Sequence, residues 1–246
     1  MSFTVVIPAR FGATRLPGKP LLDINGKPMI QHVYERAQQS EATAVYIATD
    51  DERIQEAAGQ FGAEAILTDS NHLSGTDRIY EVAEKLSLGE EEIVVNVQGD
   101  EPLIPPAAIN QVAGNLEHHP LAGIASLHEV ISDTDEIISP HAVKVVCDID
   151  GYALYFSRST IPYGSSAQAK NCLRHIGIYA YRVATLQKYV SWPPGLLEVQ
   201  EKLEQLRALY NGIKIHMAPA CEKVPAGIDT ERDLQTARKL LGAGAS

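Results

Sequence analysis

Three basic residues and two glycines follow the first apolar segment of the chain. Phe3 to Ile7 is a β-branched run typical of a strand, and the next segment, Arg10 to Pro20, contains Arg15 and Lys19 besides Arg10. Glycines allow the main chain to approach a ligand closely, and fixed cations neutralise phosphate oxygens. The segment therefore predicts a cradle for a nucleoside triphosphate, although a basic solvated turn is the structural alternative.

This segment differs from two widespread phosphate-binding loops. The interval from Gly12 to Gly18 is one residue too long for a Walker A loop, and Pro20 stands where that loop has the Ser or Thr that binds magnesium. The segment does not fit the GxGxxG pattern either, which removes the usual dinucleotide interpretation.

Two aspartates could bind a hard cation beside this cradle. Asp100 follows the apolar run Ile93 to Val97, and a carboxylate at the end of a strand can hold Mg²⁺ through few protein ligands. Asp229 precedes the last predicted helix. Either residue could instead cap a helix or a turn, and for Asp229 the residues alone weight the two interpretations equally.

Further polar residues lie near the ends of predicted elements, and each also has a structural explanation. Ser74 to Arg78 precedes a predicted helix and suits either a helix cap or hydrogen bonds to a base. Arg158 ends a predicted strand with a guanidinium that matches a carboxylate or phosphate, although a solvated charge is the commoner role. His175 and Tyr179 are four residues apart on a predicted strand, so both side chains are expected on one face.

A helix is predicted from Leu196 to Tyr210, with an apolar stripe on one side. Glu198, Glu201 and Gln205 fall opposite that stripe, with Glu204 on its flank. The same arrangement is expected for a solvated helix face, so periodicity does not distinguish a site from a surface.

The elements that would position these residues alternate between strands and helices. Predicted strands cover 3–7, 44–48, 65–67 and 93–97, and predicted helices include 52–61, 79–86 and a segment around 30–37. Such alternation gives βαβ units and a mostly parallel sheet with helices on both faces. Ligands bind at the carboxyl ends of the strands of such sheets, so the loops after Ile7, Ala48 and Val97 are expected to share one crevice.

The second half of the chain has a different pattern. Predicted strands at 143–146, 153–156 and 177–181 have no helices of normal length between them, which indicates an added β-rich lobe. We therefore expect one domain over residues 1–246. Its nucleotide-binding core would comprise about 1–120 plus 213–246, and its lobe about 121–212.

Composition excludes several classes of protein. The 246 residues carry 21 basic and 31 acidic side chains, a formal net charge of −10, without a block of Lys or Arg that could follow a nucleic-acid backbone. The start resembles no signal peptide, and no apolar run approaches the roughly 20 residues of a membrane span, so we expect a cytoplasmic protein without a membrane partner. The three cysteines are far apart and are expected to be ordinary thiols.

Several of these motifs occur together, in order, in one known family. The chain resembles the 3-deoxy-manno-octulosonate (KDO) cytidylyltransferases, also called CMP-KDO synthetases. The matching segments are Ile7–Arg10, Arg15–Leu21, Ala48–Asp51, Ser74–Arg78, Asn96–Pro102, Ala153–Arg158, His175–Tyr179, Leu203–Arg207 and Gly227–Thr230. They span nearly the whole chain.

The resemblance implies an α/β fold with a mostly parallel, Rossmann-like nucleotidyltransferase sheet of the nucleotide-diphospho-sugar transferase type and an added β-rich dimerisation lobe. It implies an enzyme that activates KDO with CTP, giving CMP-KDO and pyrophosphate for lipopolysaccharide biosynthesis. Mg²⁺ would be the cofactor, and the enzyme would be a cytoplasmic homodimer.

The resemblance also implies roles for individual residues. The nucleotide would be bound by Pro8, Ala9, Arg10, Arg15, Lys19, Ser74 and Arg78. The sugar would be bound by Gln98, Arg158, His175, Tyr179, Glu204 and Gln205. Asp100 and Asp229 would hold the metal and, with Lys19, form the catalytic group.

Other functions remain open at the level of the sequence. The acceptor could be a related acidic sugar, such as an 8-amino KDO analogue or a sialic acid, or the enzyme could make a nucleotide-diphospho-sugar. A noncatalytic nucleotide-sensing module is a further alternative, but the retention of Asp100, Asp229 and Lys19 argues against it.

Overall fold

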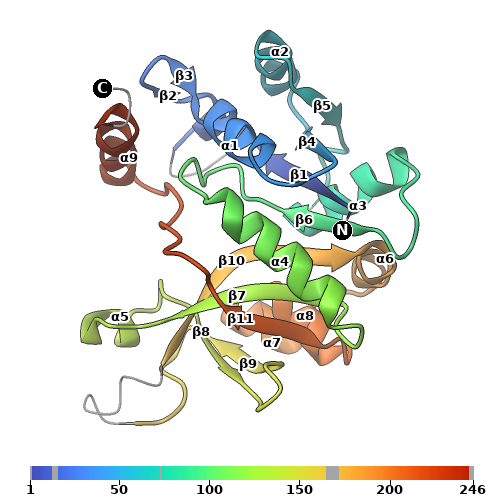
Figure 1. Ribbon diagram of the computed structural model, residues 1–246, viewed down its shortest axis with the longest axis vertical. Coiled ribbons are helices and arrows are strands. Elements are labelled where there is room, and N and C mark those ends of the chain that lie inside the picture. Colours follow the sequence, from blue (N-terminus) through green and yellow to red (C-terminus); the bar gives the residue numbers. More distant parts are fainter. Residues whose placement is uncertain (1, 13–15, 73, 165–171, 244–246) are drawn as a thin grey trace.

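A nine-stranded sheet forms the centre of the computed structural model, which describes residues 2–12, 16–72, 74–164 and 172–243. Seven strands lie in the order β11-β7-β10-β6-β1-β4-β5, and β8 and β9 are attached to β10 (Figure 1). The strands are β1 (Phe3–Ala9), β4 (Ala44–Thr49), β5 (Glu64–Leu67), β6 (Ile93–Asn96), β7 (Ile124–Val130), β8 (Lys144–Cys147), β9 (Ala153–Ser157), β10 (Leu173–Arg182) and β11 (Ile215–Pro219). A separate hairpin is formed by β2 (Asp23–Ile24) and β3 (Lys27–Pro28).

Four of the six strand pairs in the seven-strand order are parallel, as predicted, whereas the pairs that attach β8 and β9 are antiparallel. Strand β1 pairs in parallel with β4 and β6, β4 with β5, and β7 with β11. Strand β10 runs antiparallel to β6, β7 and β8. The carboxyl ends of β1, β4 and β6 therefore lie at one edge, where loops after parallel strands form ligand sites.

Helices cover both faces of this sheet. They are α1 (Met29–Gln38), α2 (Glu52–Gln60), α3 (Gly75–Lys85), α4 (Pro106–His118), α5 (Thr134–Ile138), α6 (Val183–Ser191), α7 (Leu196–Glu201), α8 (Gln205–Tyr210) and α9 (Glu231–Ala243). Because side chains alternate along a strand, Val5 and Ile7 of β1 join a core with α1, α2 and α4, whereas Val6 joins a second core with α3, α6 and α8. Burial of each such side chain contributes about 1.5–3 kcal/mol, which makes the sheet a firm base for the loops.

The predicted helix from Leu196 to Tyr210 is wrong in its continuity. It is divided at Lys202, whose φ of 55° is left-handed, into α7 and α8. The predicted apolar stripe is divided as well, since Leu196 and Val199 are 75% and 63% exposed while Leu203 and Leu206 are buried. The physical reason is tertiary: Glu201 and Lys202 are bonded to the end of β9, and these bonds override helical periodicity.

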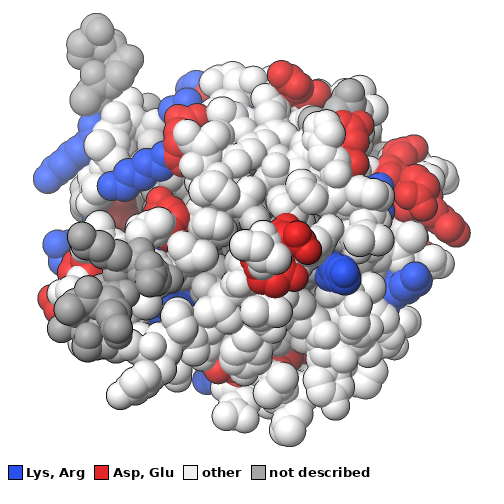
Figure 2. Space-filling view, turned by 60° about the horizontal axis from the view of Figure 1, so that its bottom comes forward, with Lys and Arg blue, Asp and Glu red and all other residues white. Residues whose placement is uncertain are grey.

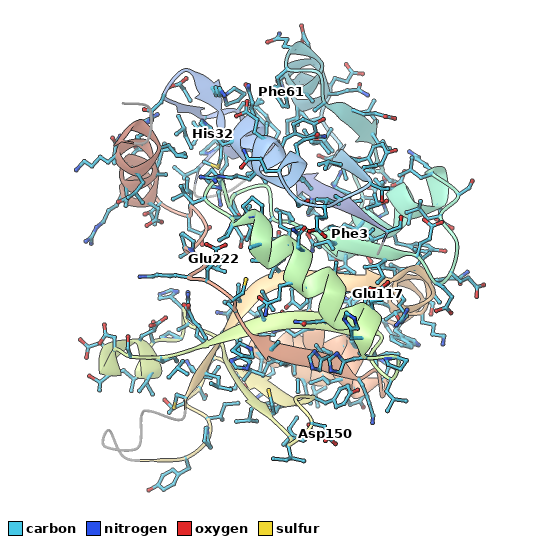
Figure 3. The ribbon with its side chains drawn as sticks, in the orientation of Figure 1. Phe3, His32, Phe61, Glu117, Asp150 and Glu222 are labelled. Carbon is cyan, nitrogen blue, oxygen red and sulfur yellow. The ribbon has the colours of Figure 1, made fainter. Side chains whose placement is uncertain are left out.

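The hairpin of β8 and β9 projects from the body of the molecule, with Asp150 in its turn (Figures 1 and 3). Strands β7 and β10 fall inside the range predicted for the lobe, yet both are integral to the main sheet. The division of the chain into a core and a lobe stays a prediction.

The surface carries charges of both signs. On the face shown in Figure 2, acidic and basic side chains are interspersed among uncharged residues. Among the described residues, none of the helices has the length and apolar character needed to cross a membrane. Cys147, Cys172 and Cys221 are free thiols, as expected.

Candidate active site

The main chain after β6 comes into close contact with the end of β1 at the carboxyl edge of the sheet. A Cβ atom added at Gly99 would lie 2.7 Å from the carbonyl oxygen of Pro8, so only glycine fits there. This contact closes the floor of a pocket of about 240 Å³. Its walls are Pro8, Ala9, Arg10, Gly12, Lys19, Pro20, Gln98, Gly99 and Asp100.

The predicted phosphate loop is held in shape on both sides of its centre. Gly18 has a φ of +67°, and its amide donates to the carbonyl of Phe11 at 3.1 Å. The guanidinium of Arg53 lies 3.4 Å above the ring of Phe11. Arg15, a predicted nucleotide ligand, lies outside the described residues. These contacts at the base of the loop hold Gly18, which directly precedes the short helical turn Lys19–Leu21.

Lys19 lies between the two aspartates predicted to bind metal. Its Nζ atom donates to Asp100 Oδ2 at 2.6 Å and to Asp229 Oδ1 at 3.1 Å. The amide of Ile228 donates to the carbonyl of Asp100 at 2.9 Å, which brings the two distant segments together. The structure therefore gathers all three residues predicted to be catalytic.

Neither aspartate caps a helix. The N-terminus of α9 is capped by Thr230 and Asp233, since the Asp233 carboxylate accepts from the amide of Thr230 at 2.8 Å. Helix α4 begins after Pro105, so Asp100 lies in the preceding turn. The helix-cap explanation is therefore wrong for both residues, whereas the alternative that Asp100 is a turn residue agrees with its place in the turn after β6.

Glu101 was missed by sequence analysis. Burial, followed by the neighbouring charge of Asp100, raises the pKa of Glu101 to about 8. Its Oε2 atom is buried without a hydrogen-bond partner among the described residues. The only sequence signal was its place beside Asp100.

A second pocket of about 260 Å³ continues the first. Gln98 belongs to the walls of both, so the two pockets are neighbours. The other predicted sugar ligands in this second pocket are Tyr179, Glu204 and Gln205. We call it the sugar pocket, and it is lined by Gly75, Thr76, Asn96, Gln98, Ile124, Gly177, Tyr179, Tyr181, Tyr189, Lys202, Leu203, Glu204 and Gln205.

His175 and Tyr179 lie next to each other, but not on a regular strand. Their ring centroids are 5.3 Å apart, although the pairing of β10 with β7 shifts between Ile176 and Tyr179. This bulge places extra residues in β10, and the Ser126 hydroxyl of β7 lies within hydrogen-bond distance of the carbonyls of Ile176 and Ile178 there. The two side chains are in contact, but the regular strand from which one face was predicted for them is wrong.

His175 lines a neighbouring cavity that shares Gly177 with the sugar pocket. Desolvation, aided by the charge of Arg174, lowers the pKa of His175 to about 3, so its imidazole is neutral at pH 7. The Ser126 hydroxyl lies within hydrogen-bond distance of His175 Nε2 and of two carbonyls. Because carbonyls only accept, the hydroxyl donates to one of them and His175 Nε2 donates to the hydroxyl.

Glu204 is held by aromatic and hydroxyl groups that sequence analysis missed. Tyr189 donates to the Glu204 carbonyl at 3.0 Å, and Thr76 donates to its carboxylate at 3.2 Å. Desolvation raises the pKa of Glu204. Tyr181 follows Tyr179 by two residues and also lines the pocket. The even spacing of the two tyrosines was the available signal for Tyr181.

Two predicted nucleotide ligands have structural partners. Ser74 forms the capping box of α3 with Asp77, which confirms its capping role. Arg78 is fully buried, donates to Asp50 at 2.8 Å and bonds to the Thr68 hydroxyl. Their contact with a nucleotide stays a prediction.

The guanidinium of Arg158 is bonded to the main chain. It donates to the carbonyl oxygens of Glu201 at 2.8 Å, Pro140 at 2.9 Å and Lys202 at 3.3 Å. These three contacts occupy most of the planar fork. Direct contact of Arg158 with a sugar stays a prediction.

Comparisons with known proteins identify the family of the chain. A family model described as cytidylyltransferase matches residues 4–215. The chain belongs to the cytidylyltransferase family. Proteins named 3-deoxy-manno-octulosonate cytidylyltransferase from Cellvibrio japonicus and Idiomarina loihiensis are 57% and 55% identical to it. Both alignments cover 99% of this chain and 100% of the relative.

Solved structures of cytidylyltransferases share the fold. A structure of CMP:2-keto-3-deoxy-manno-octonic acid synthetase complexed with CTP is 44% identical, with a TM-score of 0.90 and 99% of each chain covered. A cytidylyltransferase from Leptospira borgpetersenii is 17% identical, with a TM-score of 0.64 over 98% of this chain and 87% of that one. The second similarity concerns the fold alone.

The donor groups of this cytidylyltransferase fit a magnesium ion. Asp100 and Asp229 direct one carboxylate oxygen each at the same ammonium group, that of Lys19. Mg²⁺ is commonly bound by one or two carboxylates, with substrate phosphates and water completing its shell. The described residues contain no group of three or more His, Cys, Asp or Glu suited to a metal.

Proposed function

We propose that this cytidylyltransferase transfers the cytidylyl group of CTP to 3-deoxy-manno-octulosonate and releases pyrophosphate. The observation that carries the proposal is that the pocket lined by Arg10, Lys19 and Asp100, here called the phosphate pocket, shares the wall residue Gln98 with the sugar pocket. The relatives at 57% and 55% identity are named for this reaction, and the similar solved enzyme was complexed with CTP.

The reaction is an in-line displacement at the α-phosphorus. The hydroxyl oxygen on the anomeric carbon of the sugar forms a bond to this phosphorus, and the bond to the bridging oxygen of pyrophosphate breaks. The hydroxyl proton is lost to solvent, and the leaving pyrophosphate keeps the bonding electrons. Positioning and charge neutralisation supply most of the rate in such transfers.

Lys19 and Arg10 hold the triphosphate. Arg10 Nη2 is buried without a hydrogen-bond partner among the described residues, and a phosphate oxygen would satisfy it. Lys19 exchanges its carboxylate partners for phosphate oxygens. Both groups oppose the charge that develops on the leaving pyrophosphate.

Tyr179, Glu204 and Gln205 hold the sugar. Gln205 Nε2 is buried without a hydrogen-bond partner among the described residues, so a sugar hydroxyl can accept from it. Gln98 lies between the pockets and orients the two substrates toward each other. Asp100 and Asp229 would hold Mg²⁺, which supplies Lewis-acid stabilisation of phosphate charge when bound.

The acceptor is KDO rather than a sialic acid, an 8-amino analogue or a sugar 1-phosphate. Both relatives carry the octulosonate in their names. A noncatalytic nucleotide sensor would not need Lys19, Asp100 and Asp229 gathered beside a second pocket.

Nucleotide selection tests the proposal directly. Purified protein is incubated with Mg²⁺, KDO and each of CTP, UTP, GTP and ATP, and pyrophosphate release is measured. Release with CTP alone, abolished by EDTA, is expected. Turnover with another sugar but not with KDO would keep the chemistry and reject the acceptor.

We also infer a cytoplasmic homodimer that supplies CMP-KDO for lipopolysaccharide biosynthesis. Eleven large apolar side chains are exposed in the described residues, and nine of them lie within residues 121–212, which favours this part as the contact surface. Light scattering of Leu154→Glu tests the contact at β9. A monomer is expected for this variant, whereas Leu240→Glu on α9 should remain dimeric.

A further inference from the structure

The chain adopts a left-handed conformation at Lys202, directly before the residues that line the sugar pocket. Lys202 has φ 55° and ψ 49°, a region that residues other than glycine seldom occupy. The amides of Lys202 and Leu203 both reach the carbonyl of Glu198 and so end α7. Glu204 and Gln205, which follow this break, lie in the wall of the sugar pocket.

Glu201 fastens this break to the end of β9. One carboxylate oxygen accepts from the Ser157 hydroxyl at 2.7 Å, and the other accepts from the amide of Arg158 at 2.9 Å. Desolvation opposes ionisation, but the bonds from Arg158, Ser157 and Tyr155 outweigh it and hold the pKa of Glu201 below its ordinary value. The carboxylate is therefore charged at neutral pH and engaged at both oxygens.

Arg158 adds bonds from its own side chain to the main chain at the end of α7. Its side chain donates to the carbonyls of Glu201 and Lys202, which are among the last carbonyls of α7 and lack partners within the helix. The carbonyl of Arg158 in turn accepts from the buried Lys144 Nζ at 2.6 Å. The end of β9 is thereby a fixed anchor for the break.

Neither member of this clasp, the bonded pair of Glu201 and Arg158, lines the sugar pocket. Of the described residues, its wall includes Lys202, Glu204 and Gln205, but neither Glu201 nor Arg158. A contribution from the clasp must therefore act through the main chain at the break.

We propose that Glu201 and Arg158 are positioning residues for the acceptor sugar, which hold Lys202 left-handed so that Glu204 and Gln205 reach the sugar pocket. The proposal rests on the proposed function and adds a specificity role for two residues outside the pocket. It assigns Arg158 to the main chain rather than to the sugar carboxylate.

Steady-state kinetics separate positioning from general destabilisation. Glu201→Ala should raise the KM for KDO about tenfold while the KM for CTP changes less than about twofold, because the phosphate pocket is built on β1 and β6. Glu201→Gln keeps one acceptor and should give an intermediate value. Gln200→Ala, an exposed truncation on the same helix, is the matched control. Equal changes in both KM values would overturn the proposal.

Double-mutant cycles test the route of the effect. Glycine adopts a left-handed conformation without strain, so Glu201→Ala should cost less in a Lys202→Gly background than in the wild type. Arg158→Ala should add little to Glu201→Ala, because both break the same clasp. Full additivity in the second cycle would mean that Arg158 touches the sugar directly and would reject its assigned role.

Hydrogen exchange tests the clasp without reference to the substrate. Amides in residues 202–207 should exchange faster in Glu201→Ala than in Gln200→Ala, and Ser157→Ala provides the same test if Glu201→Ala does not fold. Unchanged exchange would overturn the clasp. Faster exchange in an enzyme inactive with CTP and KDO would instead reject the proposed function alone.

Discussion

The phosphate pocket and the sugar pocket meet at Gln98 but are built on different kinds of structure. The phosphate pocket follows two regular parallel strands, β1 and β6, whose ends touch at Gly99. The sugar pocket depends on two irregular features, the bulge in β10 and the break between α7 and α8. One pocket is a common property of parallel sheets, whereas the other is specific to this chain's tertiary contacts.

The two pockets also differ in charge. Lys19, Asp100 and Asp229 form an ionised group in the first, suited to a polyanion and a metal. In the region of the second, desolvation keeps the His175 imidazole neutral and raises the pKa of both Tyr179 and Glu204. Buried polar groups discriminate hydroxyl positions by hydrogen bonding, so we assign catalysis to the first pocket and sugar selection to the second.

Removal of the Asp100 carboxylate should lower kcat more than any other change proposed here. A smaller effect would contradict the assignment of catalysis to the phosphate pocket. Asp100→Ala is expected to lower kcat about a hundredfold to a thousandfold, because one preorganised electrostatic contact to the reacting phosphate is lost. Pyrophosphate release at saturating Mg²⁺ measures it. Asp150→Ala, in the turn of the β8–β9 hairpin, is the control and should behave like the wild type. Normal turnover of Asp100→Ala would remove this carboxylate from the mechanism.

Substitution of Lys19 tests whether the phosphate pocket binds CTP but not KDO. Lys19→Met should raise the KM for CTP roughly 10- to 100-fold through loss of a charge-assisted hydrogen bond, with little change in the KM for KDO. Lys27→Met removes an exposed lysine paired with Glu35 and serves as the control. A similar rise in both KM values would show that the pockets are not separable.

The phosphate pocket was largely predictable from the sequence. Arg10, Lys19 and Asp100 follow short apolar runs, and the carboxyl ends of parallel strands meet at one edge whatever their side chains are. The nearness of Asp229 to Asp100 depends on a long-range main-chain bond from Ile228, so the residues alone could not distinguish it from a cap.

The sugar pocket was predictable only through resemblance. Apolar spacing continues unbroken from Leu196 to Tyr210, so periodicity predicts one helix. The break after Glu201 depends on the bond of its carboxylate to the amide of Arg158, a distant residue at the end of β9. The burial that sets the pKa of Glu101 arises likewise from packing between distant segments. Such contacts leave no periodic trace in the sequence.

Glu101, the buried neighbour of Asp100, should show a pH effect on stability. Its folded pKa of about 8 exceeds the ordinary value of 4.5, so the folded state binds more protons between these limits and loses stability as pH rises through them. Glu101→Gln should therefore be more stable than the wild type by about 1–3 kcal/mol at pH 9, and equal to it below pH 4.5. Denaturant titration without nucleotide or metal measures this difference, and a pH-independent difference would contradict it.

Tyr179→Phe removes one oxygen atom from the sugar pocket and should give the smallest kinetic effect of these variants. Tyr179→Phe should raise the KM for KDO about 2- to 10-fold, the value of a neutral hydrogen bond, and leave the KM for CTP and kcat nearly unchanged. Tyr34→Phe on α1, which loses only an exposed bond from Gln38, is the matched control. If Tyr179→Phe lowered kcat instead, its hydroxyl would act on the reacting phosphate, and sugar selection and catalysis would share one pocket rather than two.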